Sequence, residues 1–114
     1  MASHLVCRGK NIGSLTISAS RLSIETGRAL TFSFVRQEGR AAVVRVTAHE
    51  PPGAGTSGAL GLQVEQQTRT SRTTGKLSTR EVLWIHWCDN VEQLSGRVED
   101  WQCSRNQYVR LPAG

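Results

Sequence analysis

The residues best suited to covalent chemistry lie in the segment EVLWIHWC, residues 81 to 88. His86 and Cys88 are two residues apart, and a cysteine beside a histidine can form a nucleophile and base pair when its thiolate is stabilised. On a strand, however, side chains at this spacing lie about 6.5 to 7 Å apart along the axis, too far for direct proton transfer. The spacing disfavours catalysis, so a small Cys/His enzyme is only a third hypothesis.

Metal and nucleotide sites have little support in the sequence. The candidate metal ligands are His4, His49, His86, Glu50 and Asp89. Apart from the adjacent His49 and Glu50, none of them forms a close pair with metal-site spacing. The glycine-rich GAGTSG, residues 53–58, lacks the lysine that follows a phosphate-binding loop. We therefore predict a protein that is not an enzyme and has no metal or cofactor.

The segment QQTRTSRTTGKLSTR, residues 66–80, carries four cations and no acid. The cations are Arg69, Arg72, Lys76 and Arg80. Thr73, Thr74 and Gly75 argue against an isolated helix, so the composition favours an extended arm. Such an arm can grip phosphates, and a solvated loop is the alternative.

Arginine dominates the positive charge of the chain. The formal net charge is +5, the pI is about 9.9, and twelve arginines stand against two lysines. Because the planar guanidinium binds phosphate through two parallel hydrogen bonds, this bias favours an anionic partner. A GC-rich genome, whose codons favour arginine, is an equally good explanation.

Length and apolar content indicate one domain, residues 1–114, with a modest core. Cys7, Cys88 and Cys103 leave an odd thiol under any pairing and match no zinc pattern, so we predict buried free thiols. No apolar run approaches the roughly 20 residues of a membrane helix. The N-terminus has no secretion-signal pattern. These features predict a cytoplasmic location without membrane association.

Alternation of apolar and polar residues dominates the first half and predicts strands with one buried face. The alternating segments are residues 14–19, 21–26, 29–35 and 42–48. A tight turn at residues 37–40 joins the last two, and Gly39 can supply the positive φ that a hairpin needs.

The second half gives weaker signals. Two prolines and three glycines make residues 49–58 a loop, and Leu60 to Val64 alternate as a strand. Residues 81–88 match either a helix start or a strand, and we favour the strand for their valine, isoleucine and tryptophans. Helical spacing predicts a short helix over residues 89–102, and QYVRL a last edge strand. The expected fold is mainly β with a short C-terminal helix (α+β), built on a single antiparallel sheet or small β sandwich.

One sheet face is expected to be polar and cationic. Thr31 and Ser33 alternate with the core positions of one strand, and Arg45 and Thr47 do so in the strand that should pair with it. Such a surface can grip phosphate and sugar groups of RNA. A plain solvated sheet face is the alternative.

At this hairpin the sequence LTFSFVRQEGRAAVVRVTAHEPP, residues 30–52, resembles the coat proteins of single-stranded RNA bacteriophages. Their central hairpin carries a similar threonine, serine and arginine-glutamine run, a short polar turn, and a valine, basic residue, valine strand that leads to a proline. The resemblance implies an antiparallel sheet whose C-terminal helices interlock two subunits, with dimers assembling around RNA, and therefore a location in the virion. It places Thr31, Ser33, Arg36 and Arg45 on the RNA-facing sheet.

The sequence thus predicts a small basic assembly and binding protein that self-associates, as a dimer or larger, and binds RNA or another polyanion. The predicted nucleic-acid-binding residues are Thr31, Ser33, Arg36, Arg45, Arg69, Arg72, Lys76 and Arg80. The alternative is an adaptor or inhibitor module that docks a partner protein, acidic or otherwise, through an exposed tryptophan face.

Overall fold

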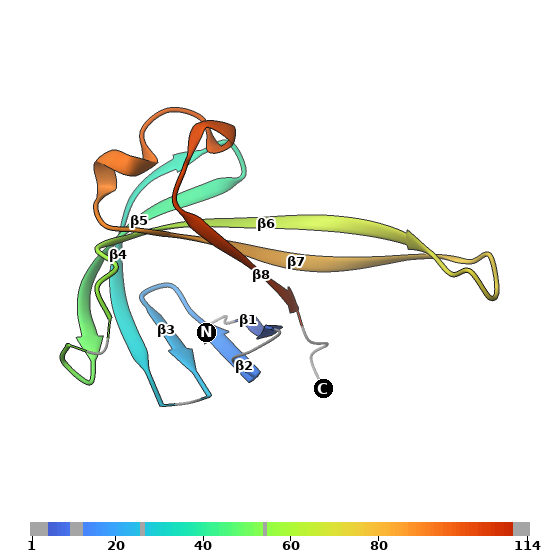
Figure 1. Cartoon of the computed structure of the whole chain (residues 1–114), viewed down its shortest axis with the longest axis horizontal. Helices are drawn as coiled ribbons and strands as arrows, with labels where there is room; N and C mark the ends of the chain where they lie inside the picture. The colour runs from blue at the N-terminus through green and yellow to red at the C-terminus, as the bar shows by residue number, and fades with distance from the viewer. Residues whose placement is uncertain (1–4, 10–12, 26, 54, 111–114) are drawn as a thin grey trace.

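Eight antiparallel strands follow one another in chain order and close into a barrel in the computed structural model, which describes residues 5–9, 13–25, 27–53 and 55–110 (Figure 1). The strands are β1 (Leu5–Gly9), β2 (Gly13–Ile17), β3 (Arg21–Ile24), β4 (Ala29–Glu38), β5 (Ala41–Glu50), β6 (Ala59–Thr70), β7 (Leu77–Cys88) and β8 (Ser104–Arg110). β8 pairs with β1 and closes the ring. Closure satisfies the strand edges that an open sheet would expose.

The barrel interior holds the main core. Apolar residues at alternate positions point inward, as the sequence predicted for the first strands. The buried members are Cys7, Leu15, Ile17, Leu22, Leu30, Phe32, Val44, Leu60, Leu83, Ile85 and Tyr108. Burial of each large aliphatic or aromatic side chain contributes about 1.5–3 kcal/mol, so these positions determine which strand face points inward.

The hairpin predicted at residues 37–40 is confirmed. Glu38 pairs with Ala41, and Gly39 between them has a φ of 60°. A bulge in β4 changes the faces beyond it: Phe34 pairs with Val44, whereas Arg36 pairs with Val43. Simple alternation would place residues 34 and 36 on one face, but the extra residue rotates the strand between them.

Residues 81–88 form the end of β7, so the strand assignment is confirmed and the alternative of a helix start is wrong. Leu83, Ile85 and Trp87 belong to the interior core, and the intervening side chains face outward. β7 therefore carries apolar or aromatic residues on both faces because both faces are covered.

The predicted helix over residues 89–102 is wrong. Two short 3₁₀ turns, η1 (Val91–Leu94) and η2 (Val98–Asp100), stand in its place. Gly96 separates them with a φ of 78°, a left-handed conformation that a continuous helix cannot contain. None of the helical turns in the described ranges has the length and apolar content to cross a membrane.

These turns cover a second, smaller core on the outside of β5, β6 and β7. Leu94 and Trp101 are buried there against Val43 and Ala59. Gly61 of β6 lies under the indole, and a Cβ at this position would come within 2.5 Å of a Trp101 ring carbon. The absence of a side chain at residue 61 therefore lets the Trp101 ring pack closely against β6.

A disulfide joins Cys88 to Cys103, with sulfur atoms 1.98 Å apart. The prediction of free thiols is wrong for these two residues, while Cys7 is free and buried as expected. The sequence spacing of 15 residues gave no sign of the pair. The fold brings the two cysteines together because residues 89–103 turn back over β7.

Candidate polyanion interface

The basic segment at residues 66–80 is an ordered two-stranded ribbon, which we call the arm. β6 and β7 pair over their full lengths, from Ala59 with Cys88 to Thr70 with Leu77. Their outer partners stop earlier: β5 reaches only Gln63 of β6, and β8 reaches only Val82 of β7. The arm therefore projects from one end of the barrel (Figure 1).

Serine and threonine build the turn at the tip of the arm. The Ser71 hydroxyl accepts hydrogen bonds from the backbone N–H groups of Thr73 and Thr74, both at 3.3 Å. The Ser71 N–H donates to the carbonyl of Lys76 at 2.9 Å, and Gly75 adopts a φ of 70°. These hydroxyl-bearing residues, whose composition suggested a solvated loop, therefore form a specific turn.

The register gives the arm two different faces. Gln67 pairs with Arg80 and Arg69 with Ser78, so these four residues share one face, the cationic face. The opposite face carries Thr68, Thr70, Leu77 and Thr79. Arg72 and Lys76 lie in and beside the turn that joins the strands.

A small amide network positions Arg80. Its Nε and Nη2 donate to Oε1 of Gln67 at 3.2 and 3.0 Å, and Nε2 of Gln107 on β8 donates to the same oxygen at 3.3 Å. The Gln67 amide in turn donates to Oε1 of Glu65 at 3.2 Å. This network fixes the guanidinium of Arg80 on the cationic face without neutralising its charge by a direct salt bridge among the described residues.

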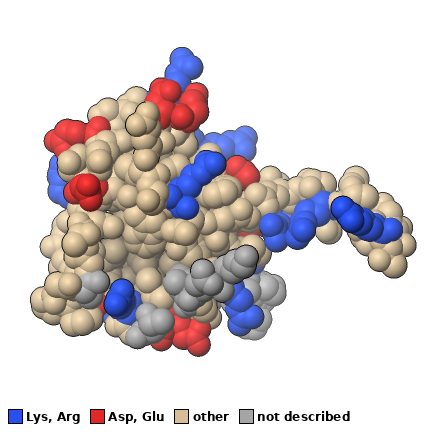
Figure 2. Space-filling model, viewed as in Figure 1, with Lys and Arg blue, Asp and Glu red and all other residues tan. Residues whose placement is uncertain are grey.

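The other three cations of the arm are exposed. Arg69, Arg72 and Lys76 form no ion pair with any residue that the structure describes. The two acids that flank the arm stay at its base, where Glu81 is paired with Arg110 at 2.8 Å. Figure 2 shows the result: Lys and Arg atoms follow the arm outward, whereas Asp and Glu atoms lie on or next to the barrel.

Arg105 extends the cationic face onto the barrel, a residue that the sequence analysis missed. It pairs with His86 in the β7–β8 ladder, and its guanidinium carbon lies 4.8 Å from the centre of the Trp84 ring. Trp84 and Arg80 lie on the same face of β7. Alternation of side chains ahead of Tyr108 could have indicated Arg105, but the sequence analysis predicted that this last strand begins at residue 107.

The predicted sheet-face residues lie elsewhere. Ser33 pairs with Arg45, and the Thr31 and Thr47 hydroxyl oxygens are 2.9 Å apart on the outside of β4 and β5. Arg45 also pairs with Ala59, at the end of β6 opposite to the arm. Six residues of β6, 60–65, lie between Ala59 and the first residue of the arm, a distance of about 23 Å along the strand.

Arg36 belongs to neither patch. Its Nη1 pairs with Glu38 at 2.9 Å, and its Nη2 donates to the carbonyl oxygen of Leu94. Arg36 therefore ties the covering turns to β4, and its charge is already neutralised. The eight predicted residues divide into the arm group of four, the sheet-face group of three, and one structural arginine.

The tryptophans do not form an exposed face. Trp101 is 7% exposed, Trp87 lies in the barrel with its indole N–H donating to Asn106 at 2.8 Å, and Trp84 is half-buried under Arg105. The tryptophans therefore do not gather on one exposed face, and docking of a partner protein through them stays a prediction.

Cys88 and His86 cannot act as a nucleophile and base in this structure, since the Cys88 sulfur is in the disulfide and His86 is 2% exposed. Within the described ranges, no three His, Cys, Asp or Glu residues are grouped closely enough to hold a metal ion.

No family model matches this chain, and no curated protein or solved structure is similar enough to it to indicate a relationship. The resemblance to RNA bacteriophage coat proteins therefore stays a prediction.

Proposed function

We propose that this protein binds RNA through the cationic face and tip of the arm, chiefly by contacts with phosphates. The observation that carries the proposal is the separation of charge: four cations and no acid occupy residues 66–80 on a ribbon that projects from the barrel. Cations that protrude without carboxylate partners can approach a polyanion without first breaking ion pairs.

The chemistry of the arm suits contacts with the nucleic-acid backbone. Guanidinium groups bind phosphate oxygens through paired hydrogen bonds, and such contacts hold the ligand in place without specifying its sequence. The opposite face presents the hydroxyls of Thr68, Thr70 and Thr79, which can both donate to and accept from a ribose 2′-hydroxyl. These hydroxyls are the reason to place RNA ahead of DNA.

Salt dependence of RNA affinity tests this function directly. Each phosphate contact with single-stranded nucleic acid adds about 0.7 to the magnitude of the slope of log K against log salt. Four arm cations and Arg105, five cations in all, together predict a slope of about −3.5. A complex whose affinity does not change with salt would exclude binding through these cations.

A coat-like subunit that packages RNA is the narrower form of the proposal. The β4–β5 hairpin that carries the resemblance is present, whereas residues 89–110 contain no helix that could interlock two subunits. Size-exclusion chromatography with light scattering and absorbance at 260 and 280 nm separates the two forms. A large particle with a nucleic-acid spectrum supports the coat-like form, and a nucleic-acid-free monomer excludes it.

A further inference from the structure

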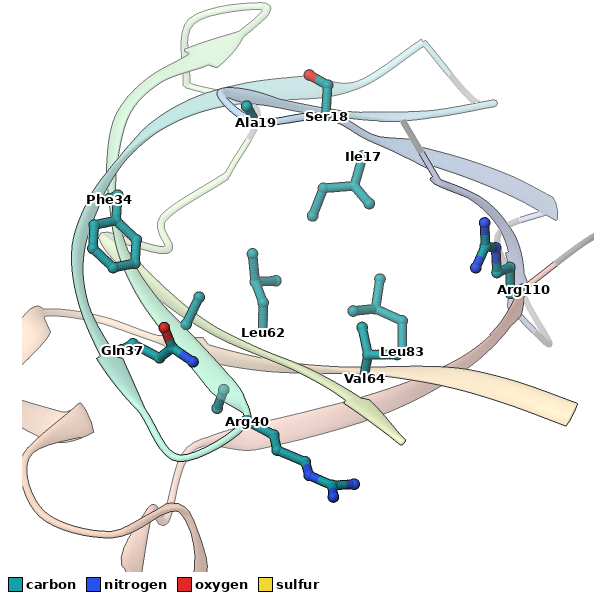
Figure 3. Close-up of a pocket in the computed structure, with 12 residues that line it drawn as sticks. Ile17, Ser18, Ala19, Phe34, Gln37, Arg40, Leu62, Val64, Leu83 and Arg110 are labelled. Atoms are coloured by element: carbon teal, nitrogen blue, oxygen red, sulfur yellow. The ribbon is translucent and has the colours of Figure 1, made fainter. Parts of the chain in front are cut away.

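A cavity of about 440 Å³ opens at the end of the barrel from which the arm projects. Ile17, Leu62 and Leu83 point into it from three strands (Figure 3). Small eight-stranded barrels can hold one ligand inside, and small-molecule sites typically measure about 300–1,000 Å³. The cavity therefore has the size and the apolar interior of a site for a single small molecule.

The rim of this cavity carries apolar side chains that the protein does not cover. Among the described residues, three large hydrophobic side chains are exposed: Leu77 at 72%, Phe34 at 63% and Val64 at 37%. Leu77 is on the arm, but Phe34 and Val64 both line the cavity mouth. A ligand seated between them would remove apolar surface from water, which is favourable by about 25 cal/mol per Å².

The charge at the mouth favours an anion. Among the residues that the structure describes, two arginines and no carboxylate line the cavity. Arg110 lies across the mouth from Phe34 and uses Nη1 to pair with Glu81, whereas Arg40 starts at the rim and points outward (Figure 3). Arg40 has no ion pair with any residue in the described ranges. Its long, exposed side chain can turn over the mouth to meet a ligand.

From these features we infer that the barrel binds a small amphipathic carboxylate, of the class of medium-chain fatty acids. The alkyl chain lies among Ile17, Leu62 and Leu83 and passes between Phe34 and Val64. The carboxylate remains at the rim, where Arg40 and the unpaired nitrogens of Arg110 donate to it. This site is separate from the cationic face of the arm and does not depend on RNA binding.

Decanoate, below its critical micelle concentration, is the probe, and isothermal titration calorimetry is the measurement. Uncharged decanol serves as the matched ligand. The wild-type protein should bind decanoate about tenfold more tightly than decanol, since a hydrogen-bonded ion pair at a rim is worth roughly this factor. The double variant R40Q/R110Q should lose this preference and keep its affinity for decanol.

Two single variants test the apolar part of the site. F34S should weaken the binding of both ligands, whereas L77S, which removes an equally exposed apolar side chain from the arm, should weaken neither. Both side chains are exposed, so neither substitution should prevent folding. Removal of the arm cations in R69Q/R72Q/K76Q should leave decanoate affinity unchanged, which separates this inference from RNA binding.

Three results would overturn the inference. The first is the absence of decanoate binding to the wild-type protein. The second is an equal loss of affinity in F34S and L77S, which would indicate adsorption at the surface. The third is an unchanged preference for decanoate in R40Q/R110Q.

Discussion

The imidazole of His86 meets the indole of Trp101 edge to face, with ring centroids 5.0 Å apart and planes at 85°. Neither ring nitrogen of His86 nor the indole nitrogen of Trp101 has a hydrogen-bond partner among the described residues. Burial, followed by the nearby charge of Arg105, lowers the pKa of His86 below its ordinary value of 6.5. Burial in the folded state therefore favours the neutral imidazole.

Acidification should destabilise the protein through His86. Below pH 6.5 and down to the lower pKa of the folded state, the unfolded chain binds more protons than the folded one, so the free energy of unfolding decreases as the pH is lowered. Above pH 6.5 the imidazole is neutral in both states, so this loss of stability is absent. Urea denaturation at a series of pH values from 7.5 to 5 measures the effect.

The variant H86F isolates this contribution because phenylalanine keeps an aromatic contact with Trp101 but does not titrate. We expect H86F to lose most of the decline in stability between about pH 6.5 and 5, whereas H49Q, which leaves His86 in place, retains it. An identical decline in H86F and wild type would rule out His86 as its source.

Reduction of the Cys88–Cys103 disulfide should lower the free energy of unfolding by about 3 kcal/mol, the entropic effect expected for a loop of roughly 15 residues. Denaturation with and without dithiothreitol measures the loss. The variant C88A/C103A should be insensitive to the reductant, and C7A should respond as the wild type does. A wild-type protein that is equally stable in both conditions would contradict this prediction.

The substitution G61A should cost about 1–3 kcal/mol, because its Cβ would approach a Trp101 ring carbon to 2.5 Å and the covering turns would have to shift. W101L removes most of the ring that the new methyl group meets. In that background G61A should therefore cost much less, and a double-mutant cycle by denaturation measures the coupling. Equal costs in the two backgrounds would show that Trp101 does not determine the requirement for glycine.

The alternation of apolar and polar residues predicted the strands well where one face of the strand is buried. The alternation of Leu30 and Phe32 gave β4, and Gly39 gave the turn into β5. The bulge after Phe34 was not predictable from local alternation, and beyond it Arg36 contacts the covering turns. The resemblance to phage coat proteins placed Arg36 on the RNA-facing sheet, whereas its guanidinium contacts Glu38 and the carbonyl oxygen of Leu94.

Residues 89–102 show a second limit of local pattern. Val91, Leu94, Val98 and Trp101 do pack toward the barrel as their helical spacing suggests. Gly96 and the disulfide prevent a continuous helix, and only the folded chain shows that Cys103 lies beside Cys88. Disulfides persist mainly in oxidising compartments, and the cytoplasmic or virion location stays a prediction.

The candidate site was predicted in its composition but not in its geometry. Charge counting found the arm cations, yet the pairing of Gln67 with Arg80 and the addition of Arg105 depend on strand register. Arg45 and the arm do not form one continuous surface, since the two lie toward opposite ends of β6. Register and barrel closure are non-local, and neither follows from the spacing of residues in one segment.

The salt dependence of RNA binding in two charge-matched variants tests the central claim most directly. R69Q/R72Q/K76Q removes three cations from the arm, and R8Q/R28Q/R97Q removes three exposed cations from the barrel and its covering turns. Fluorescence anisotropy with a labelled oligouridylate of about 20 nucleotides gives the affinities. The account predicts that the arm variant loses about 2 from the magnitude of the salt slope while the barrel variant keeps most of the wild-type slope. Equal losses in the two variants would show that net charge, and not the arm, attracts the RNA.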